Sequence, residues 1–273
     1  MRKISSPAGR KGILRPGVAV CCAALLALSL GAEAKAAPAT PLPDAPQPHL
    51  QTKKPVTVRE TPRNILRDQA AIWTSPARLR PRDLEWLGPL TLATGAAIAT
   101  DHRAMSQVVS HDRSFNNANI NASNAMIGGF IAAPVALFGV GHFGQNAHAR
   151  AAGILSGEAL VDGVVVEQGM KLIFWRERPA VDGAHGRFFQ SGVGTDSSFP
   201  SSHSVLAWAV ASELAGEYPS RWKQFLLYTA ATGVSLTRVL GQEHFPSDVM
   251  VGSAAGWLVG RYVYHRHHQM QVE

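Results

Sequence analysis

Residues 237–248 of the chain read TRVLGQEHFPSD, and an apolar segment of helical pattern follows them. His244 and Asp248 stand four positions apart in this stretch, and Pro246 between them suits the first turn of a helix. We therefore expect the Asp248 carboxylate to fold back onto the His244 imidazole and to fix its tautomer. Arg238 adds a cation six residues before the histidine, so the stretch predicts a site for an anion.

Two more motifs lie before this stretch, and the first is KLIFWRERP at residues 171–179. Lys171 and Arg178 are seven residues apart, about two helical turns, so we expect both side chains on one face of a helix that ends at Pro179. Their convergence suits an anion, because lysine supplies a point charge and arginine a planar fork of donors. A solvated basic helix end is the plainer alternative for this motif taken alone.

The second motif is FPSSH at residues 199–203, directly before an apolar helical run. A helix that begins here presents the free backbone N–H groups of its first turn, which form an anion site. His203 would stand beside that anion as a proton donor. The serine pair, Ser201 and Ser202, is by itself also a simple helix cap. The order and spacing of all three motifs favour one common anion site.

Helical patterns dominate the chain from Val58 onward, and alternating strand patterns with turn dipeptides are absent from the sequence. We predict an all-α fold, a bundle of about six helices, preceded by an amphipathic stretch at 62–73. The predicted apolar segments lie at about 83–100, 122–143, 148–175, 203–217, 221–238 and 247–264. The string GVGHFG at 139–144 matches a dinucleotide-binding pattern, but no strand pattern precedes it, so we reject that function.

The first 34 residues have the pattern of an export signal. A basic lead precedes the apolar run 18–30, and Ala32-Glu33-Ala34 offers a small-x-small cleavage site; an uncleaved anchor helix is the alternative. Both cysteines lie in the apolar run, so we expect no disulfide or thiol chemistry in the mature chain. Residues 35–58, rich in Ala, Pro and Thr, predict a disordered spacer, and residues 59–273 form the predicted functional domain.

The formal net charge of +7 does not support nucleic-acid binding, since five of the 26 basic residues fall in the predicted signal against one of the 19 acidic residues. The charged fraction is 16%, below the ~25% that is typical of globular proteins. This composition fits a tightly packed soluble helical protein and a small membrane protein equally well.

The predicted helices give conflicting indications about whether the protein inserts into a membrane. Residues 125–144 carry no charge over about twenty positions, which is long enough to span a bilayer. The next segment holds Glu158, Asp162 and Glu167, which in lipid would have to face the bundle interior or a watery pocket. Glycines at every fourth position of the last segment allow close helix contact in water or in lipid, and they are Gly252, Gly256 and Gly260. The sequence is therefore compatible with an integral membrane protein and with a soluble protein.

The three motifs resemble those of the type-2 phosphatidic acid phosphatase superfamily, which also includes bacterial acid phosphatases and vanadium haloperoxidases. The family pattern is K-x6-RP, then PSGH, then SR-x5-H-x3-D, and the match covers residues 171–248. The six-helix layout extends the likeness over about 83–264. Ser202 stands where glycine is usual and adds a side chain near the expected phosphate, while Thr237 stands where serine is usual and keeps a hydroxyl.

The resemblance implies a role for each motif residue. His244 would be the nucleophile, His203 the general acid and Asp248 the partner that orients the nucleophile. The implied phosphate-binding groups are Lys171, Arg178, Arg238, Ser201 and the backbone amide of Ser202. We expect neither a metal nor another cofactor, and we expect a bell-shaped pH profile, because the two histidines need opposite protonation states.

The expected function is therefore hydrolysis of phosphate monoesters or pyrophosphate through a phosphohistidine, by an exported protein at or beyond the cytoplasmic membrane. We favour a phosphorylated lipid, such as phosphatidate or undecaprenyl pyrophosphate, whose tail would leave along Phe188 and Phe189. A soluble periplasmic acid phosphatase of broad specificity is the first alternative, and a haloperoxidase is a weaker one. A non-catalytic helical membrane protein that binds phosphorylated lipid is the alternative outside the enzymes.

Overall fold

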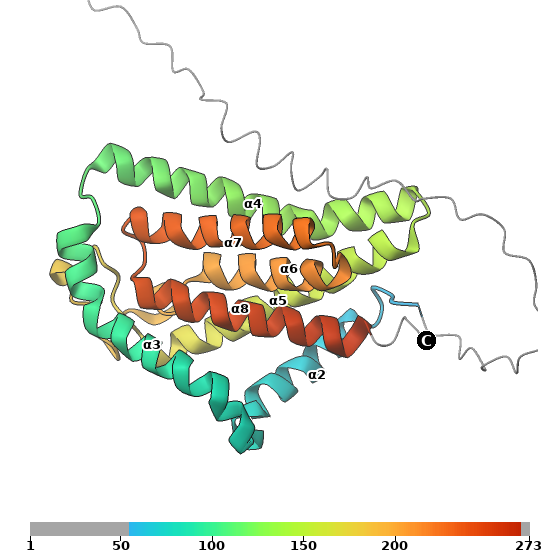
Figure 1. The fold of residues 1–273 in the computed structure, drawn as a ribbon, viewed down its shortest axis with the longest axis horizontal. Coiled ribbons are helices and arrows are strands. Elements are labelled where there is room, and N and C mark those ends of the chain that lie inside the picture. The colour runs from blue at the N-terminus through green and yellow to red at the C-terminus, as the bar shows by residue number, and fades with distance from the viewer. Residues whose placement is uncertain (1–54, 269–273) are drawn as a thin grey trace, which may run out of the picture.

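The computed structural model describes residues 55–268, which contain seven α-helices and no β-strand (Figure 1). The predicted all-α fold is confirmed, as is the bundle of about six helices. The helices are α2 (Thr61–Thr74), α3 (Leu84–Arg103), α4 (Arg113–Phe143), α5 (Ala147–Phe174), α6 (Ser202–Glu217), α7 (Arg221–Leu240) and α8 (Pro246–His268). The predicted export signal and residues 35–54 of the predicted spacer lie outside the described residues.

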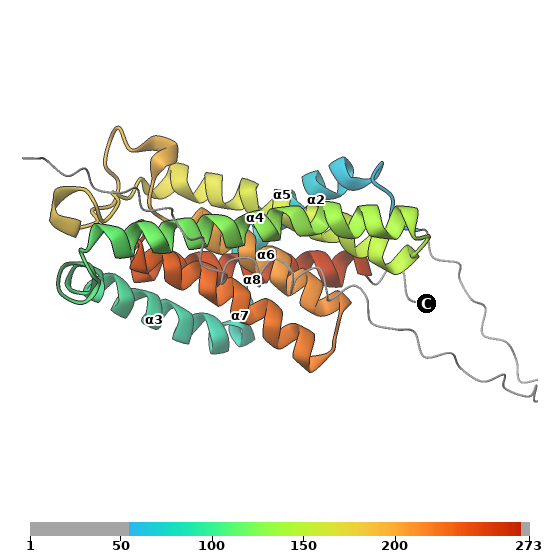
Figure 2. The ribbon, with the colours of Figure 1, turned by 90° about the horizontal axis from the view of Figure 1, so that it is seen from above.

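Successive helices from α4 to α8 alternate in direction, so one end of the bundle collects the functional segments (Figures 1 and 2). The C-terminal ends of α3, α5 and α7 meet the N-terminal ends of α4, α6 and α8 there, together with the loop 175–201. We call this the loop end. All three sequence motifs fall at it, because each motif begins or ends a helix on this side.

α6 is the central helix, and it packs against α5, α7 and α8. Nearly all of its residues are buried, and its many alanines let the neighbouring helices approach. The approach of α8 is closest at Gly256 and Gly260, where an added Cβ would overlap the backbone carbonyls of Val205 and Ala209. The glycines at every fourth position of α8 therefore serve close helix contact inside the protein, as expected, and such contact occurs in water and in lipid alike.

α2 lies across α5 and covers two buried carboxylates. Glu158 and Asp162 are both fully buried, as expected for charges that face the bundle interior. The amide of Gln69 donates to Asp162 Oδ1 at 2.8 Å, and the amide of Asn64 donates to Glu158 Oε1 at 3.3 Å. The amphipathic α2 thus supplies amide donors to acids that would otherwise be buried without partners.

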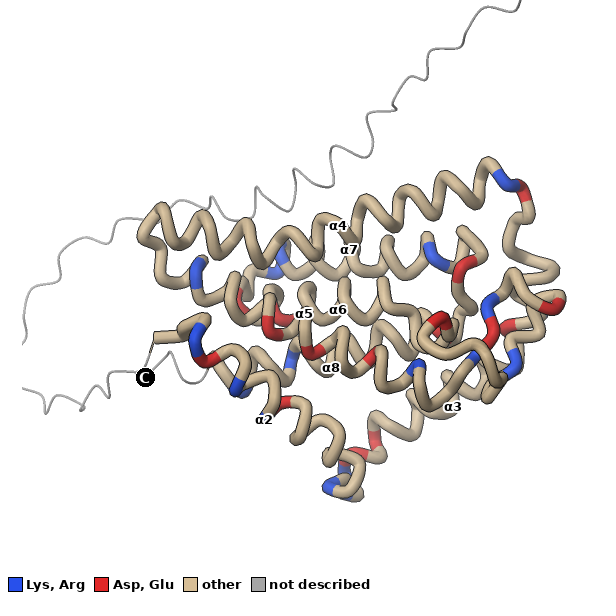
Figure 3. The backbone as a smooth tube through the Cα atoms, turned by 180° about the vertical axis from the view of Figure 1, so that it is seen from behind, with Lys and Arg blue, Asp and Glu red and all other residues tan. Residues whose placement is uncertain are grey.

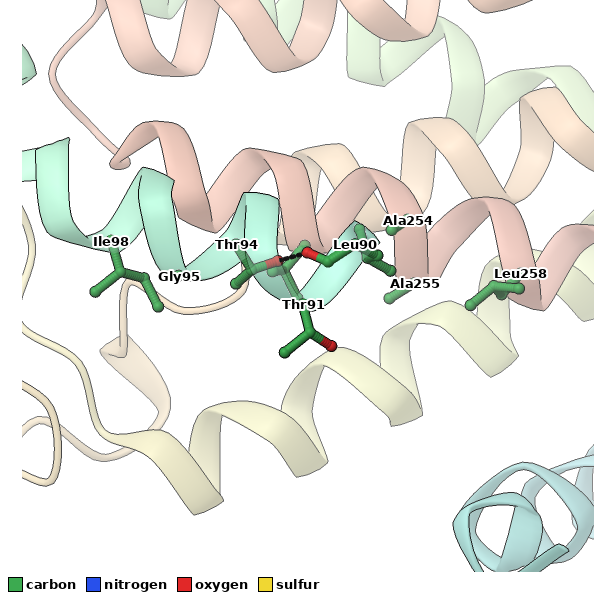
Figure 4. Close-up of a pocket in the computed structure, with 9 residues that line it drawn as sticks. Leu90, Thr91, Thr94, Gly95, Ile98, Ala254, Ala255 and Leu258 are labelled. Carbon is green, nitrogen blue, oxygen red and sulfur yellow. Dashed lines mark hydrogen bonds between the residues drawn. The ribbon is translucent and has the colours of Figure 1, made fainter. Parts of the chain in front are cut away.

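The outer surface is apolar along much of the bundle. Within residues 55–268, α4 is the one helix that is long and apolar enough to cross a membrane, and large side chains such as Val135 and Phe143 are exposed on it. Figure 3 shows acidic and basic residues near the ends of α4 and α7 but none along their middles. α3 and α8 also enclose an apolar groove of about 420 Å³ (Figure 4), lined by residues such as Leu90, Ile98 and Leu258.

Candidate active site

The first motif straddles the end of α5. Lys171 lies in the last turn and is buried, but the helix ends at Phe174, because Trp175 takes a left-handed backbone conformation with φ of 39°. Arg178 therefore lies in the following loop. The expected continuous helix with Lys171 and Arg178 on one face is wrong, and the loop itself returns Arg178 to the site.

Residues 188–198 fold back onto this helix end and satisfy its backbone. The Phe189 N–H donates to the Phe174 carbonyl at 2.9 Å, and the Gln190 N–H donates to the Trp175 carbonyl at 3.1 Å. The Ser198 N–H donates to the Arg176 carbonyl at 2.8 Å. These bonds replace the helical ones that the chain loses after residue 174, and they bring the FPSSH motif beside KLIFWRERP.

α6 begins at the second motif, with Ser201 at the N-cap. The Ser201 side chain makes no capping bond, and its hydroxyl is fully buried without a hydrogen-bond partner among the described residues. The first-turn N–H groups of a helix also lack partners within the helix. A simple serine cap therefore does not explain this pair. The arrangement leaves one hydroxyl and several backbone donors available to an anion.

The two positions that depart from the family pattern each bind within the protein. The Ser202 hydroxyl donates to Glu167 Oε2 of α5 at 3.0 Å. The Thr237 hydroxyl donates to the Gly233 carbonyl of its own helix at 2.8 Å. The side chain that replaces glycine is thus tied to α5, and the hydroxyl at position 237 supports α7.

His244 lies in the loop between α7 and α8 and is 2% exposed. Its Nδ1 is 2.8 Å from the Ser198 carbonyl oxygen, which can only accept, so Nδ1 carries the hydrogen and Nε2 keeps the free lone pair. Asp248 Oδ2 is 3.7 Å from Nδ1, beyond hydrogen-bonding distance. The expected direct contact is therefore replaced by the Ser198 carbonyl, with the Asp248 carboxylate behind it as a nearby negative charge.

Asp248 is held by a residue that the motifs did not single out. Arg176 is 1% exposed, and its guanidinium contacts Asp248 Oδ1 at 2.6 Å and Asp101 Oδ2 at 2.7 Å. Its plane also lies 4.1 Å from the ring centroid of Phe245 and 4.5 Å from that of Phe188. Arg176 thus joins α3, the loop 175–201 and the start of α8. The sequence gives one signal for Arg176: it is a charged residue within an aromatic stretch, and Asp101 can neutralise its charge.

His203, on the first turn of α6, has its Nε2 3.0 Å from Asn124 Oδ1 of α4. Burial and the nearby charges of Arg238, His244, Lys171 and Arg178 lower the pKa of His203 to about 3. Those four groups come from the first and third motifs and His203 from the second, so the structure brings the expected cations and histidines to one place. Asn124 was missed, because an asparagine in an apolar helix carries no specific signal.

Each of the three expected phosphate-binding cations already faces a carboxylate. Lys171 Nζ is 3.6 Å from Glu167 Oε2. Arg178 pairs with Asp196 at 3.0 Å and with Glu243 at 3.2 Å, and Arg238 pairs with the same Glu243 oxygen at 3.1 Å. The charges of these cations are therefore balanced by internal acids. Arg238 Nε remains buried without a partner among the described residues.

Burial also sets the protonation of the two groups that would react or bind. It lowers the pKa of His244 below the usual value, so this imidazole is neutral near pH 7. It lowers the pKa of Lys171 as well, while Glu167 opposes that shift. Among residues 55–268, no group of three His, Cys, Asp or Glu side chains has the arrangement of a metal site.

The chain is similar to known phosphatases. The lipid A 1-phosphatase of Porphyromonas gingivalis is 37% identical over 81 residues, which are 29% of this chain and 18% of that protein. This chain thus matches less than a fifth of that relative's length. The structure of a transmembrane PAP2-type phosphatidylglycerolphosphate phosphatase from Bacillus subtilis aligns over 77% of this chain and 96% of its own, at 20% identity and a TM-score of 0.43. Residues 151–271 match the model of the PAP2 superfamily, so the predicted resemblance to this superfamily is confirmed over that region.

Proposed function

We propose that the chain is a metal-independent phosphatase that forms a phosphohistidine on His244. The observation that carries the proposal is a buried, neutral imidazole whose Nδ1–H is held by the Ser198 carbonyl. The charges of Arg238 and Arg178 lower the pKa of His244 and, with Lys171, that of His203, so these cations lie near both histidines. A neutral imidazole with a fixed tautomer beside several cations suits attack on a phosphate.

A phosphate would bind donors that other groups leave available. Within residues 55–268, the buried Ser201 hydroxyl and Arg238 Nε have no hydrogen-bond partner, and the first-turn N–H groups of α6, that of Ser202 among them, have no acceptor within the helix. The three cations would neutralise the charge on the equatorial oxygens as the transition state forms. Lys171 and Arg178 would then exchange their carboxylate partners for phosphate oxygens.

In the first step, His244 Nε2 forms a bond to phosphorus, and the bond from phosphorus to the leaving oxygen breaks. His203 gives that oxygen a proton. Because burial and the nearby cations lower the pKa of His203, it needs a bound phosphate, whose negative charge offsets the cations, before it holds the proton. In the second step, His203 takes a proton from water, and the water oxygen attacks phosphorus. The bond from phosphorus to His244 Nε2 breaks, and inorganic phosphate is released.

We infer a phosphorylated lipid as the substrate class. A relative that matches 29% of the chain is named for dephosphorylating a lipid, and α4 presents an exposed apolar face of membrane-spanning length. Beside the site, Phe174, Phe188 and Phe199 pack together, and Phe189 at their edge is 67% exposed. An acyl chain would meet this edge while the head group sits among the cations.

The site would work outside the cytoplasm, since residues 1–34 have the pattern of an export signal. We propose that α4 contacts lipid and keeps the protein at the membrane. N-terminal sequencing of the mature protein should begin near Lys35, or recover an uncleaved anchor in the membrane fraction. Recovery of Met1 in the cytosol would contradict export.

Phosphate release across a panel tests the proposal. Purified full-length protein in detergent is given phosphatidate, phosphatidylglycerol phosphate, undecaprenyl pyrophosphate and soluble p-nitrophenyl phosphate, with and without a chelator. We expect turnover that survives the chelator, is inhibited by orthovanadate and is fastest on a lipid. Loss in chelator that zinc or magnesium restores contradicts the metal-independent chemistry. Preference for the soluble ester, with release from membranes by carbonate, assigns the soluble acid phosphatase instead.

A further inference from the structure

Glu243 is the residue directly before His244, and its carboxylate bridges two of the three phosphate-binding cations. Its Oε2 accepts from Arg178 Nη1 at 3.2 Å and from Arg238 Nη2 at 3.1 Å. The side chain is 32% exposed, so it can leave this position without breaking the packed core. The described part of the chain shows no other carboxylate oxygen shared by two of these cations.

A carboxylate oxygen that two guanidinium groups share stands where an oxygen of a bound phosphate would stand. Guanidinium groups bind carboxylates and phosphates with the same planar geometry, so the two acceptors compete for the same donors. A phosphate that reached both arginines with Glu243 still in place would also lie against its negative charge. Binding of a phosphate therefore requires Glu243 to give up at least one of the two arginines.

We propose, resting on the proposed function, that Glu243 is a displaceable counter-ion that lowers the affinity of the site for free phosphate. The carboxylate holds Arg178 and Arg238 in place while the site is empty, and it returns to them when product leaves. A substrate that brings apolar contacts in addition to its phosphate can displace Glu243, whereas inorganic phosphate has only its charge for that exchange. The residue thereby favours phosphorylated lipids over free phosphate and shortens the stay of the product.

Two other carboxylates of the same region provide matched controls. Glu177 lies next to Arg178 in sequence but pairs with Arg187 at 3.3 Å, away from the phosphate-binding groups. Asp196 pairs with Arg178 alone and is 81% exposed. Glu177→Gln changes the net charge by the same amount as Glu243→Gln, so it reports the general effect of charge. Asp196→Asn releases one arginine partly and should have an intermediate effect.

The test is calorimetric binding of inorganic phosphate and of tungstate to the full-length protein in detergent at pH 7 and low salt. Glu243→Gln should lower both dissociation constants about three- to tenfold, which is the range for loss of one charged competitor at a partly exposed site. Glu177→Gln should leave them unchanged. The KM for p-nitrophenyl phosphate should fall in parallel, with kcat within about threefold of the wild type.

Unchanged or weaker anion binding in Glu243→Gln overturns the proposal, as does an equal effect of Glu177→Gln. A purely structural brace would lower Tm and weaken anion binding together, which is the opposite of the expected gain. If the wild type binds tungstate but hydrolyses no phosphoester, the proposed phosphatase function is wrong, and the binding comparison still tests the role of Glu243. If no variant binds an anion, both the proposed phosphatase function and the proposed role of Glu243 are wrong.

Discussion

The two halves of α5 bury charged side chains in different ways. Near the loop end, Glu167 is matched by Lys171 and by the Ser202 hydroxyl, and the neighbouring cations share exposed carboxylates that can move. Farther from the loop end, Glu158 and Asp162 are matched by neutral amides of α2, and neither forms a salt bridge with a cation of residues 55–268. The first arrangement can exchange an internal acid for a substrate anion, and the second can only hold two helices together.

The difference separates charges for chemistry from charges for packing, and substitutions can test it. Changes at the loop end that leave the buried ion pairs of Arg176 intact should reduce activity with little loss of stability. Changes at the contact between α2 and α5 should do the reverse. If both sets of substitutions reduced activity only by destabilising the protein, the distinction between charges for chemistry and charges for packing would be wrong.

The largest expected effect is that of His244→Ala, which removes the proposed nucleophile. Turnover should fall by about 10⁴-fold or more, because a residue that forms the covalent intermediate is needed in both steps. Far-UV circular dichroism and Tm should stay near those of the wild type. His111→Ala, which changes an exposed histidine in the loop before α4, is the control and should keep full activity.

Asp248→Asn should have a smaller effect, about 10- to 100-fold on kcat, since the Ser198 carbonyl still fixes the His244 tautomer. In a Ser-His-Asp triad the same change is far more damaging because the tautomer is lost. Stability should fall too, because the buried Arg176 loses one of its two carboxylates. Ser198→Ala keeps the carbonyl and should cost less than tenfold. A loss of activity in Asp248→Asn as large as that in His244→Ala would show that Asp248, and not the Ser198 carbonyl, fixes the tautomer of His244.

A third prediction concerns pH and His203. The pKa of this histidine is about 3 in the folded protein and near 6.5 when unfolded, so between these values the unfolded chain binds a proton that the folded chain does not. The stability that depends on His203 is therefore present above pH 6.5 and lost as the pH falls toward 3. In His203→Gln the fall in Tm between pH 7 and pH 4.5 should be about 5–10 °C smaller than in the wild type, since the shift is worth about 2.5 kcal/mol at pH 4.5 and each kcal/mol moves Tm by about 2–4 °C. An identical fall in both proteins would contradict the depressed pKa.

The smallest effect on activity should come from Gln69→Ala at the α2 contact. Asp162 loses its amide donor, which should lower the free energy of unfolding by about 1–3 kcal/mol. The kcat at 25 °C should stay within about twofold of the wild type. Urea denaturation followed by circular dichroism gives the first quantity and phosphate release the second. A large loss of kcat without loss of stability would place α2 in the active site.

The sequence predicts most of the bundle and the motif residues, for identifiable reasons. Long apolar segments predict α3 and α5–α8 to within a few residues. α4 begins at Arg113 instead of about 122, because its first turns are polar and Asp112 caps them by accepting from the Phe115 N–H at 2.7 Å. The convergence of the motifs is also predicted, since each lies at a helix end on the same side.

The supporting residues were not predicted, because their roles depend on tertiary contacts. The left-handed turn at Trp175, which ends α5 early, follows from backbone bonds to a loop that is distant in sequence. Arg176 and Ser198 act on Asp248 and His244 through such contacts, and no spacing rule indicates them. Glu243 reads as an ordinary polar residue of a turn until the two arginines are placed around it.

Direct capture of the intermediate tests the central claim. Full-length His203→Gln is mixed with ³²P-labelled p-nitrophenyl phosphate, whose leaving group needs no proton, and is quenched in alkaline denaturant. The first step should proceed, while water attack is slow because the residue that would deprotonate the water is gone. Label that is stable to alkali, labile to acid and located on the peptide containing His244 is the predicted result. Turnover without labelled protein, label on another residue, or the same label in His203→Gln/His244→Ala would contradict a phosphohistidine at His244.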